Sequence, residues 1–175
     1  MEIKRTFAEK KRMYIGLISD THCSFPDDVR KFLEPVDVIW HAGDFGNLDT
    51  LRDIATFKPL TGVFGNCDPY DVRNFAKYTQ LIECEGKRIL MMHIGGFPGR
   101  YDYKAFQLIN AHRPDIFVCG HSHILRVIND TKYNMLTINP GACGHQGFHN
   151  VRTAIRFHID NSDIHDMEVG EWPRL

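Results

Sequence analysis

The sequence lacks long apolar runs, a net charge of either sign and paired cysteines, and each absence excludes a class of protein. No 18 consecutive residues are apolar, so we expect no membrane-spanning helix and no membrane partner. The formal net charge is −1, so there is no strong signal for nucleic-acid binding. The positively charged N-terminal segment is not followed by an apolar run, which is not typical of a secretory signal peptide.

The five cysteines are scattered along the chain and form no Cys-x-x-Cys pair. An odd, scattered set is typical of reduced thiols, disfavours a zinc ribbon and predicts a cytoplasmic protein. At 175 residues the chain is long enough to form one hydrophobic core without disulfides. We expect residues 1–12, which are polar and rich in Lys and Arg, to form a flexible extension, and residues 13–175 to form a single domain.

Alternating strand and helix patterns occupy the first part of the chain. Two amphipathic segments that each end in proline, residues 27–35 and 47–59, predict helices. Short apolar runs bounded by turn residues predict five buried strands, at residues 14–19, 36–43, 60–65, 88–93 and 115–120. The resulting β-α-β-α-β order is typical of an α/β sandwich.

The second half of the chain favours antiparallel hairpins. Residues 81–93 predict a hairpin that turns at Glu85, Gly86 and Lys87, and residues 153–170 predict a terminal hairpin. Residues 124–141 predict another, with its turn at Asn129 and Asp130. Because there is no internal repeat or linker, we expect one domain built from two sheets with helices outside.

Histidine is abundant, with ten dispersed residues, and several of them follow predicted strands together with Asp and Asn. The motifs SDTH, HAGD, GNCD, MMH and CGHSH supply Asp20, His22, Asp44, Asn66, His93, His121 and His123. Successive motifs are separated by 24, 22, 27 and 28 residues, about one strand and its connection each. Ligands of open α/β sheets bind at the carboxyl ends of the strands, so we expect these side chains to converge there.

The seven side chains form a mixed nitrogen and oxygen ligand set. Four imidazoles, two carboxylates and one amide oxygen are too many for a single tetrahedral zinc ion and include no thiolate, so we infer two divalent ions. Alternate residues of an extended segment share a face, so His121 and His123 would each contact one ion. Two such ions, about 3.5–4 Å apart, can share a hydroxide and hold the attacking and leaving oxygens during displacement at phosphorus.

In order along the chain, these motifs resemble the calcineurin-like metallophosphoesterase signature D-x-H, G-D, G-N-x-[DE], H and G-H-x-H. The spacing and short length are similar to the small YfcE-like phosphodiesterase branch, and the resemblance spans roughly residues 13–160. It implies a four-layer α/β/β/α sandwich of two mixed sheets flanked by helices. It also implies a first ion on Asp20, His22 and His123, a second on Asn66, His93 and His121, and Asp44 as the bridge. The expected ions are Mn²⁺, with Ni²⁺, Zn²⁺ or Fe as alternatives.

The resemblance implies a metal-dependent phosphodiesterase that hydrolyses a small phosphate-ester substrate through a hydroxide bridging the two ions. Two alternatives stay open: a phosphomonoesterase or nucleotidase, and a protein-binding scaffold related to the retromer subunit of this branch. The sequence carries no motif that identifies the substrate, and assembly into a homo-oligomer is left open.

One motif departs from the family pattern, because many relatives have histidine where this chain has Cys67. That histidine is thought to contact the phosphate or to protonate the leaving group, so cysteine disfavours hydrolysis of simple monoesters. We predict catalytic roles for Asp44, Asn66, Cys67 and Asp68. For Asp68, orienting a histidine ligand is the favoured interpretation and acting as the acid is the alternative. Asn66 and Arg100 are predicted to contact substrate, since a planar guanidinium suits a phosphate.

Three further histidines lie near the predicted sheet edge. His41 is expected to be structural, because the family signature assigns it no ligand role. His145 and His149 lie in the loop that follows the 124–141 hairpin, where one of them is a candidate substrate contact.

Overall fold

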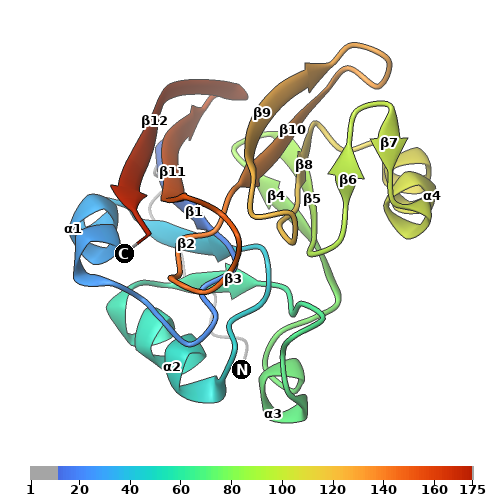
Figure 1. Cartoon of the computed structure of the whole chain (residues 1–175). Helices are drawn as coiled ribbons and strands as arrows, with labels where there is room; N and C mark the ends of the chain where they lie inside the picture. Colours follow the sequence, from blue (N-terminus) through green and yellow to red (C-terminus); the bar gives the residue numbers. More distant parts are fainter. Residues whose placement is uncertain (1–11, 175) are drawn as a thin grey trace, which may run out of the picture.

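The computed structural model describes residues 12–174, which form two large mixed sheets and four helices (Figure 1). Residues 1–11 and 175 lie outside the described part, and with them all of the predicted N-terminal extension except Arg12, which begins the first strand. No helix among the described residues is both long and apolar enough to cross a membrane.

The first sheet has the strand order β12-β11-β1-β2-β3. Its strands β1, β2 and β3 pair in parallel, whereas β11 pairs antiparallel with both β1 and β12. The strands are β1 (Arg12–Ile18), β2 (Val38–His41), β3 (Leu60–Gly62), β11 (Val151–Asp160) and β12 (Asp163–Pro173).

The second sheet has the order β4-β5-β8-β10-β9, with β5, β8 and β10 parallel and the outer strands antiparallel to their neighbours. A small ribbon of β6 (Gly96–Phe97) and β7 (Arg100–Tyr101) follows β5. The strands are β4 (Thr79–Cys84), β5 (Lys87–Met92), β8 (Ile116–Val118), β9 (Leu125–Asp130) and β10 (Met135–Pro140).

Three of the four helices lie on the outer faces of the two sheets (Figure 1). The fourth, α3, belongs to the connection between β3 of the first sheet and β4 of the second. α1 and α2 pack on the first sheet and α4 packs on the second. Asn47 caps α2 by accepting the N–H of Thr50, and Asp102 caps α4 by accepting the N–H of Lys104. The helices are α1 (Asp27–Leu33), α2 (Leu48–Phe57), α3 (Tyr70–Arg73) and α4 (Tyr103–His112).

Side-chain alternation along the strands explains the layers. On β1, Ile15 and Leu17 join a core that includes Ile89 and Met91 of β5, so this core lies between the sheets. The neighbouring Ile18 packs with residues of α1 and α2 instead. The predicted four-layer α/β/β/α sandwich of two mixed sheets is therefore confirmed.

The prediction of a turn at Asn129 and Asp130 was wrong. β9 continues through Asp130, and the chain reverses over residues 131–134, where Asn134 has a φ of 49°. Asp130 is buried and accepts hydrogen bonds from the hydroxyl of Tyr101 at 2.6 Å and the N–H of Lys132 at 3.0 Å. These contacts hold a residue typical of turns at the end of a strand.

Candidate metal centre

Five of the seven predicted ligands meet where the strands of both sheets end. Asp20, His22 and His123 form one group whose ligand atoms lie within 4.8 Å of one another, and Asp20, Asp44 and His93 form a second. The first sheet contributes the residues after β1 and β2, and the second contributes those after β5 and β8. The cluster therefore depends on the packing of the two sheets against each other.

The ring nitrogens of the cluster point toward its carboxylates. His93 Nε2 lies 3.1 Å from Asp44 Oδ2, and His123 Nε2 lies 3.2 Å from Asp20 Oδ1. His22 Nε2 lies 3.8 Å from both Asp20 Oδ1 and Asp44 Oδ2, and 3.2 Å from His123 Nε2. Asp20 belongs to both groups, and Asp44 also forms a third group with His22 and Cys67. Asp44 thus lies near His22 and His93, which are predicted ligands of different ions, as expected for the bridging carboxylate.

The backbone of the cluster adopts a conformation that side chains disfavour. Five predicted ligands have positive φ angles, a region that costs of order 1 kcal/mol or more per residue. Backbone hydrogen bonds hold the loops in place, including Asp20 N–H to Gly43 O at 2.9 Å and His22 N–H to Asp44 O at 3.1 Å. The φ angles are 54° at Asp20, 43° at His22, 60° at Asp44, 68° at His121 and 58° at His123.

The donor set fits divalent cations. His93 Nδ1 lies 2.8 Å from the carbonyl of Ala42 and donates to it, which leaves Nε2 as the nitrogen with a lone pair. Nε2 is buried and lacks a hydrogen-bond partner despite its short distance to Asp44, and Asp20 Oδ1 is buried and unpartnered too. Groups that face one another in this way are favourable when a proton or a metal cation lies between them, and a divalent ion would take the place of that proton.

Both carboxylates remain ionised. Burial opposes ionisation of Asp44, yet the His93 imidazole and the N–H of Cys67 hold the pKa of this carboxyl below its ordinary value. Burial likewise opposes ionisation of Asp20, but the contacts with His123, His93 and Ser19 together outweigh it, so the pKa is lowered. Two negative charges are therefore present for cations to neutralise.

His121 and Asn66 lie beside this cluster. The N–H of His121 donates to Asp20 Oδ2 at 3.1 Å, and its ring lies 5.3 Å from the His93 ring. Asn66 is exposed and lines a cavity of about 250 Å³ together with His93. Both residues lie near His93, which is the third predicted ligand of the second ion.

Asp68 organises the loops beneath the site. Its carboxylate accepts the N–H groups of Asp44 at 3.0 Å, Gly46 at 2.8 Å and Gly65 at 2.8 Å. These partners are backbone groups rather than the histidine ligand that we expected. Burial raises the pKa of Asp68 despite these donors, and the residue ties the loop after β2 to the loop after β3.

Three other histidines lie near this edge of the sheets, and they differ in what they contact. His41 is fully buried, which lowers its pKa to about 3, and its neutral ring accepts the Gly43 N–H and donates to Thr21 Oγ1. His149 Nδ1 lies 3.2 Å from His123 Nδ1, whereas His145 Nδ1 contacts the carbonyl of Arg174. His149 is thus a neighbour of a predicted ligand.

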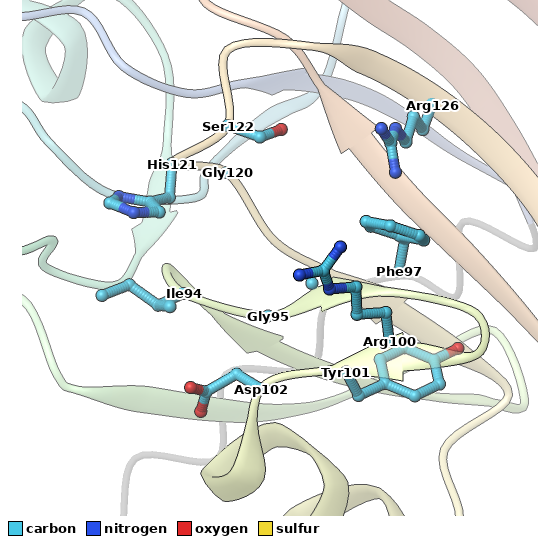
Figure 2. Close-up of a pocket in the computed structure, with 11 residues that line it drawn as sticks. Ile94, Gly95, Phe97, Arg100, Tyr101, Asp102, Gly120, His121, Ser122 and Arg126 are labelled. Atoms are coloured by element: carbon cyan, nitrogen blue, oxygen red, sulfur yellow. The ribbon is translucent and has the colours of Figure 1, made fainter.

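Arg100 lies outside the cluster, in a separate cavity of about 600 Å³ that His121 also lines (Figure 2). Arg126 lines the same cavity and was missed from the sequence. It occupies β9, where a single arginine in a strand pattern carries no signal of its own.

Another group of potential ligands lies on the terminal hairpin, away from the strand ends. His165 Nδ1 lies 2.9 Å and His158 Nδ1 3.8 Å from Asp166 Oδ2. The guanidinium of Arg12 already lies 3.4 Å from the same oxygen. A resident positive charge makes this group an ion-pair cluster rather than a metal site.

The fold and the Asp/His cluster are typical of metal-dependent phosphoesterases. A family model described as calcineurin-like phosphoesterase superfamily domain matches residues 13–162, and the chain belongs to this superfamily. The chain is 31% identical over 141 residues to a probable metallophosphoesterase of Methanothermobacter thermautotrophicus, covering 74% of this chain and 77% of that protein. A probable metallophosphoesterase of Methanocaldococcus jannaschii is 30% identical over 139 residues, covering 74% of this chain and 68% of that protein.

Solved structures share the fold. Vps29 from Entamoeba histolytica, complexed with zinc, matches with a TM-score of 0.71 and 17% identity, covering 93% of this chain and all of that one. A predicted phosphoesterase from Streptococcus pneumoniae matches with a TM-score of 0.65 and 20% identity, covering 93% of this chain and 90% of that one. At these identities the likeness concerns the fold alone.

Proposed function

We propose that this chain is a cytoplasmic phosphodiesterase that hydrolyses small phosphate diesters at a centre of two divalent metal ions. The observation that carries the proposal is the pair of buried, ionised carboxylates, Asp20 and Asp44, whose oxygens face the Nε2 atoms of His93 and His123. Asp20, His22 and His123 would hold one ion, and Asn66, His93 and His121 the other, with Asp44 shared. Family membership and the two metallophosphoesterase relatives support metal-dependent ester hydrolysis.

When bound, two such ions would supply a hydroxide nucleophile near neutral pH and neutralise charge on the phosphoryl oxygens. Asp44 would contribute to both ion sites and so keep the two ions close to each other. His93, fixed by its hydrogen bond to Ala42, would present Nε2 without rotating. The Asp68 carboxylate would keep Asp44 in place through its backbone N–H.

Cys67 favours diesters or activated esters as substrates. Desolvation of the thiol and the nearby Asp44 carboxylate raise the pKa of Cys67 to about 11. Such a thiol is a poor proton donor at neutral pH, so the alkoxide of a simple monoester would leave without assistance. The same pKa makes a thiolate nucleophile unfavourable.

The scaffold alternative shares this fold. Because a Vps29 structure of the same architecture was solved with zinc, metal content by itself does not separate an enzyme from a scaffold. Catalytic turnover is therefore the measurement that distinguishes them.

The test combines elemental analysis with hydrolysis assays on aryl diesters and alkyl monoesters in the presence of Mn²⁺. We expect two ions per chain and turnover of the diesters. Asp44→Asn should lower kcat/KM more than a hundredfold, because the neutral amide would hold the two ions less well than the carboxylate would. The matched control is Asp163→Asn, at an exposed position on the terminal hairpin, which should retain activity.

Two results would contradict the proposal. The first is a fully metal-loaded protein that hydrolyses none of the esters. The second is an Asp44→Asn variant that keeps both ions and turns over like the wild type.

A further inference from the structure

Two guanidinium groups line one cavity beside the candidate metal centre. The cavity measures about 600 Å³ and extends from His121 and Ser122 to Arg100 of β7 and Arg126 of β9 (Figure 2). The His121 backbone contacts Asp20, so the cavity adjoins the metal centre directly. Both arginines come from the second sheet and its ribbon, outside the family motifs.

Packing holds Arg126 in position, and its guanidinium forms no hydrogen bond with the part of the chain that the structure describes. Its guanidinium carbon lies 4.1 Å from the centre of the Phe97 ring, a cation–π contact. Phe97 and Arg100 are paired across the β6–β7 ribbon, so their side chains share one face of it. Figure 2 shows both guanidinium groups directed into the same space.

Neither guanidinium has a carboxylate within ion-pair distance among residues 12–174. The carboxylate of Asp102, which also lines the cavity, caps α4 through the N–H groups of Lys104 and Ala105. In Figure 2 it points away from both arginines. Among residues 12–174, therefore, no carboxylate compensates the positive charge of the cavity.

Ser122 adds a third donor on the side next to the metal centre. Its Oγ accepts hydrogen bonds from Asn139 Nδ2 at 3.0 Å and from the N–H of Ile124 at 3.3 Å. Because both contacts use its lone pairs, the hydroxyl hydrogen is available to a ligand. The cavity therefore offers donors and positive charge to an anion.

We infer that this cavity is a subsite for a second anionic group, a phosphate or carboxylate carried by the organic part of the substrate. The inference rests on the proposed function, because the scissile phosphate would lie at the metal centre while its ester group extends past His121. Arg100 and Arg126 would contact the second anion through their guanidinium N–H groups. The substrate class is then a phosphodiester with an additional charged group.

The kinetic test uses three 4-nitrophenyl phosphodiesters whose second ester group is ethyl, 2-carboxyethyl or 2-phosphonoethyl. In the Mn²⁺-loaded wild type we expect higher kcat/KM for the charged esters than for the ethyl ester. The ratio of kcat/KM for a charged ester to kcat/KM for the ethyl ester should fall at least tenfold in Arg126→Gln, since the substitution removes a charge-assisted hydrogen bond. Comparison of the carboxyethyl and phosphonoethyl esters identifies which anion the subsite prefers. Arg52→Gln, an exposed arginine of α2, is the matched control and should leave the ratio unchanged.

A binding measurement makes the subsite testable without turnover. Inorganic phosphate is titrated into the metal-free protein while the backbone amide signals of Phe97, Arg100 and Ser122 are followed by NMR. We expect these signals to shift, and Arg126→Gln to weaken the apparent affinity at least fivefold. Unperturbed signals, or equal affinity in the variant, would overturn the subsite.

The two proposals fail in different ways. Hydrolysis of all three diesters with equal kcat/KM would overturn the subsite and leave the phosphodiesterase intact. If no diester is hydrolysed, the proposed function fails, and the phosphate titration alone then decides whether the cavity binds anions.

Discussion

Cys67 is the residue that most sharply defines the chemistry available at this site. It lies between Asn66 and Asp68, its N–H donates to Asp44 at 2.8 Å, and its thiol pKa is raised to about 11. The thiol is near the candidate ligands but holds its proton too tightly to act as an acid at neutral pH. Position 67 should therefore control which leaving groups the enzyme accepts.

Cys67→His should narrow the preference for aryl diesters over alkyl monoesters by about tenfold or more. An imidazolium with a pKa of ~6.5 donates a proton at neutral pH far better than this thiol does. The measurement is kcat/KM for one ester of each kind, with equal metal loading verified. Cys67→Ala is the control, because it supplies no donor and should keep the wild-type ratio. An unchanged ratio in Cys67→His would mean that this position does not govern protonation of the leaving group.

Charged pairs, as well as the apolar cores, stabilise the packing of helices against the sheets. Arg152 of β11 is buried, with a side chain 4% exposed, and its guanidinium donates twice to Asp28 of α1, at 3.0 and 2.5 Å. The Arg152 guanidinium beside Asp28 holds the pKa of that carboxyl below its usual range. This pair links the helix that follows the first ligand loop to the first sheet.

Asp28→Asn should destabilise the fold at pH 7 by about 1–2 kcal/mol, because it leaves a buried guanidinium without its carboxylate. The value lies below that for fully buried pairs because the Asp28 side chain is 38% exposed. Since the folded pKa lies below the unfolded value of 3.8, the ionised pair stabilises above pH 4. That contribution is lost as the pH falls through the folded pKa. The difference between variant and wild type should therefore shrink at pH 3 or below.

Urea unfolding at pH 7 and pH 3 provides the measurement. Asp27→Asn is the matched control, since the neighbouring Asp27 side chain is fully exposed and lies 3.8 Å from Arg30. It should change stability little at either pH. A loss in Asp28→Asn that stays constant with pH would contradict the assigned ion pair.

At the scale of the whole molecule, the candidate metal centre joins the two halves of the sandwich. Asp20, His22 and Asp44 follow strands of the first sheet, whereas His93 and His123 follow strands of the second. An ion bound to both sets would connect the sheets at one edge, in addition to the apolar core between them. Metal binding is therefore expected to stabilise the entire fold.

Adding Mn²⁺ to the metal-free protein should raise its melting temperature by roughly 5–10 °C at a hundredfold excess over Kd. Differential scanning calorimetry before and after chelation with EDTA measures the effect. Asp20→Asn removes one of the two buried charges and should abolish most of the increase, whereas Asp163→Asn should retain it. An equal increase in Asp20→Asn and wild type would show that Mn²⁺ binds elsewhere.

Much of the fold was predictable because the deciding signals are local. Short apolar runs bounded by turn residues predicted β1 and β5, and amphipathic segments ending in proline predicted α1 and α2. The turn of the β9–β10 hairpin was misplaced, because a buried contact between Asp130 and the distant Tyr101 holds that residue in the strand. Local propensity carries no information about such a contact.

The sequence by itself determined which chemical groups follow each strand, since the motifs from SDTH to GHSH are contiguous residues with fixed spacing. Only the tertiary structure decided how those groups are presented. Packing of the two sheets brings His93 and His123 to the carboxylates of Asp20 and Asp44, and the Ala42 carbonyl selects which nitrogen of His93 faces them. Packing also places Arg126 over Phe97 beside that centre. These outcomes depend on contacts between residues far apart in the chain, whose geometry is set by the folded core.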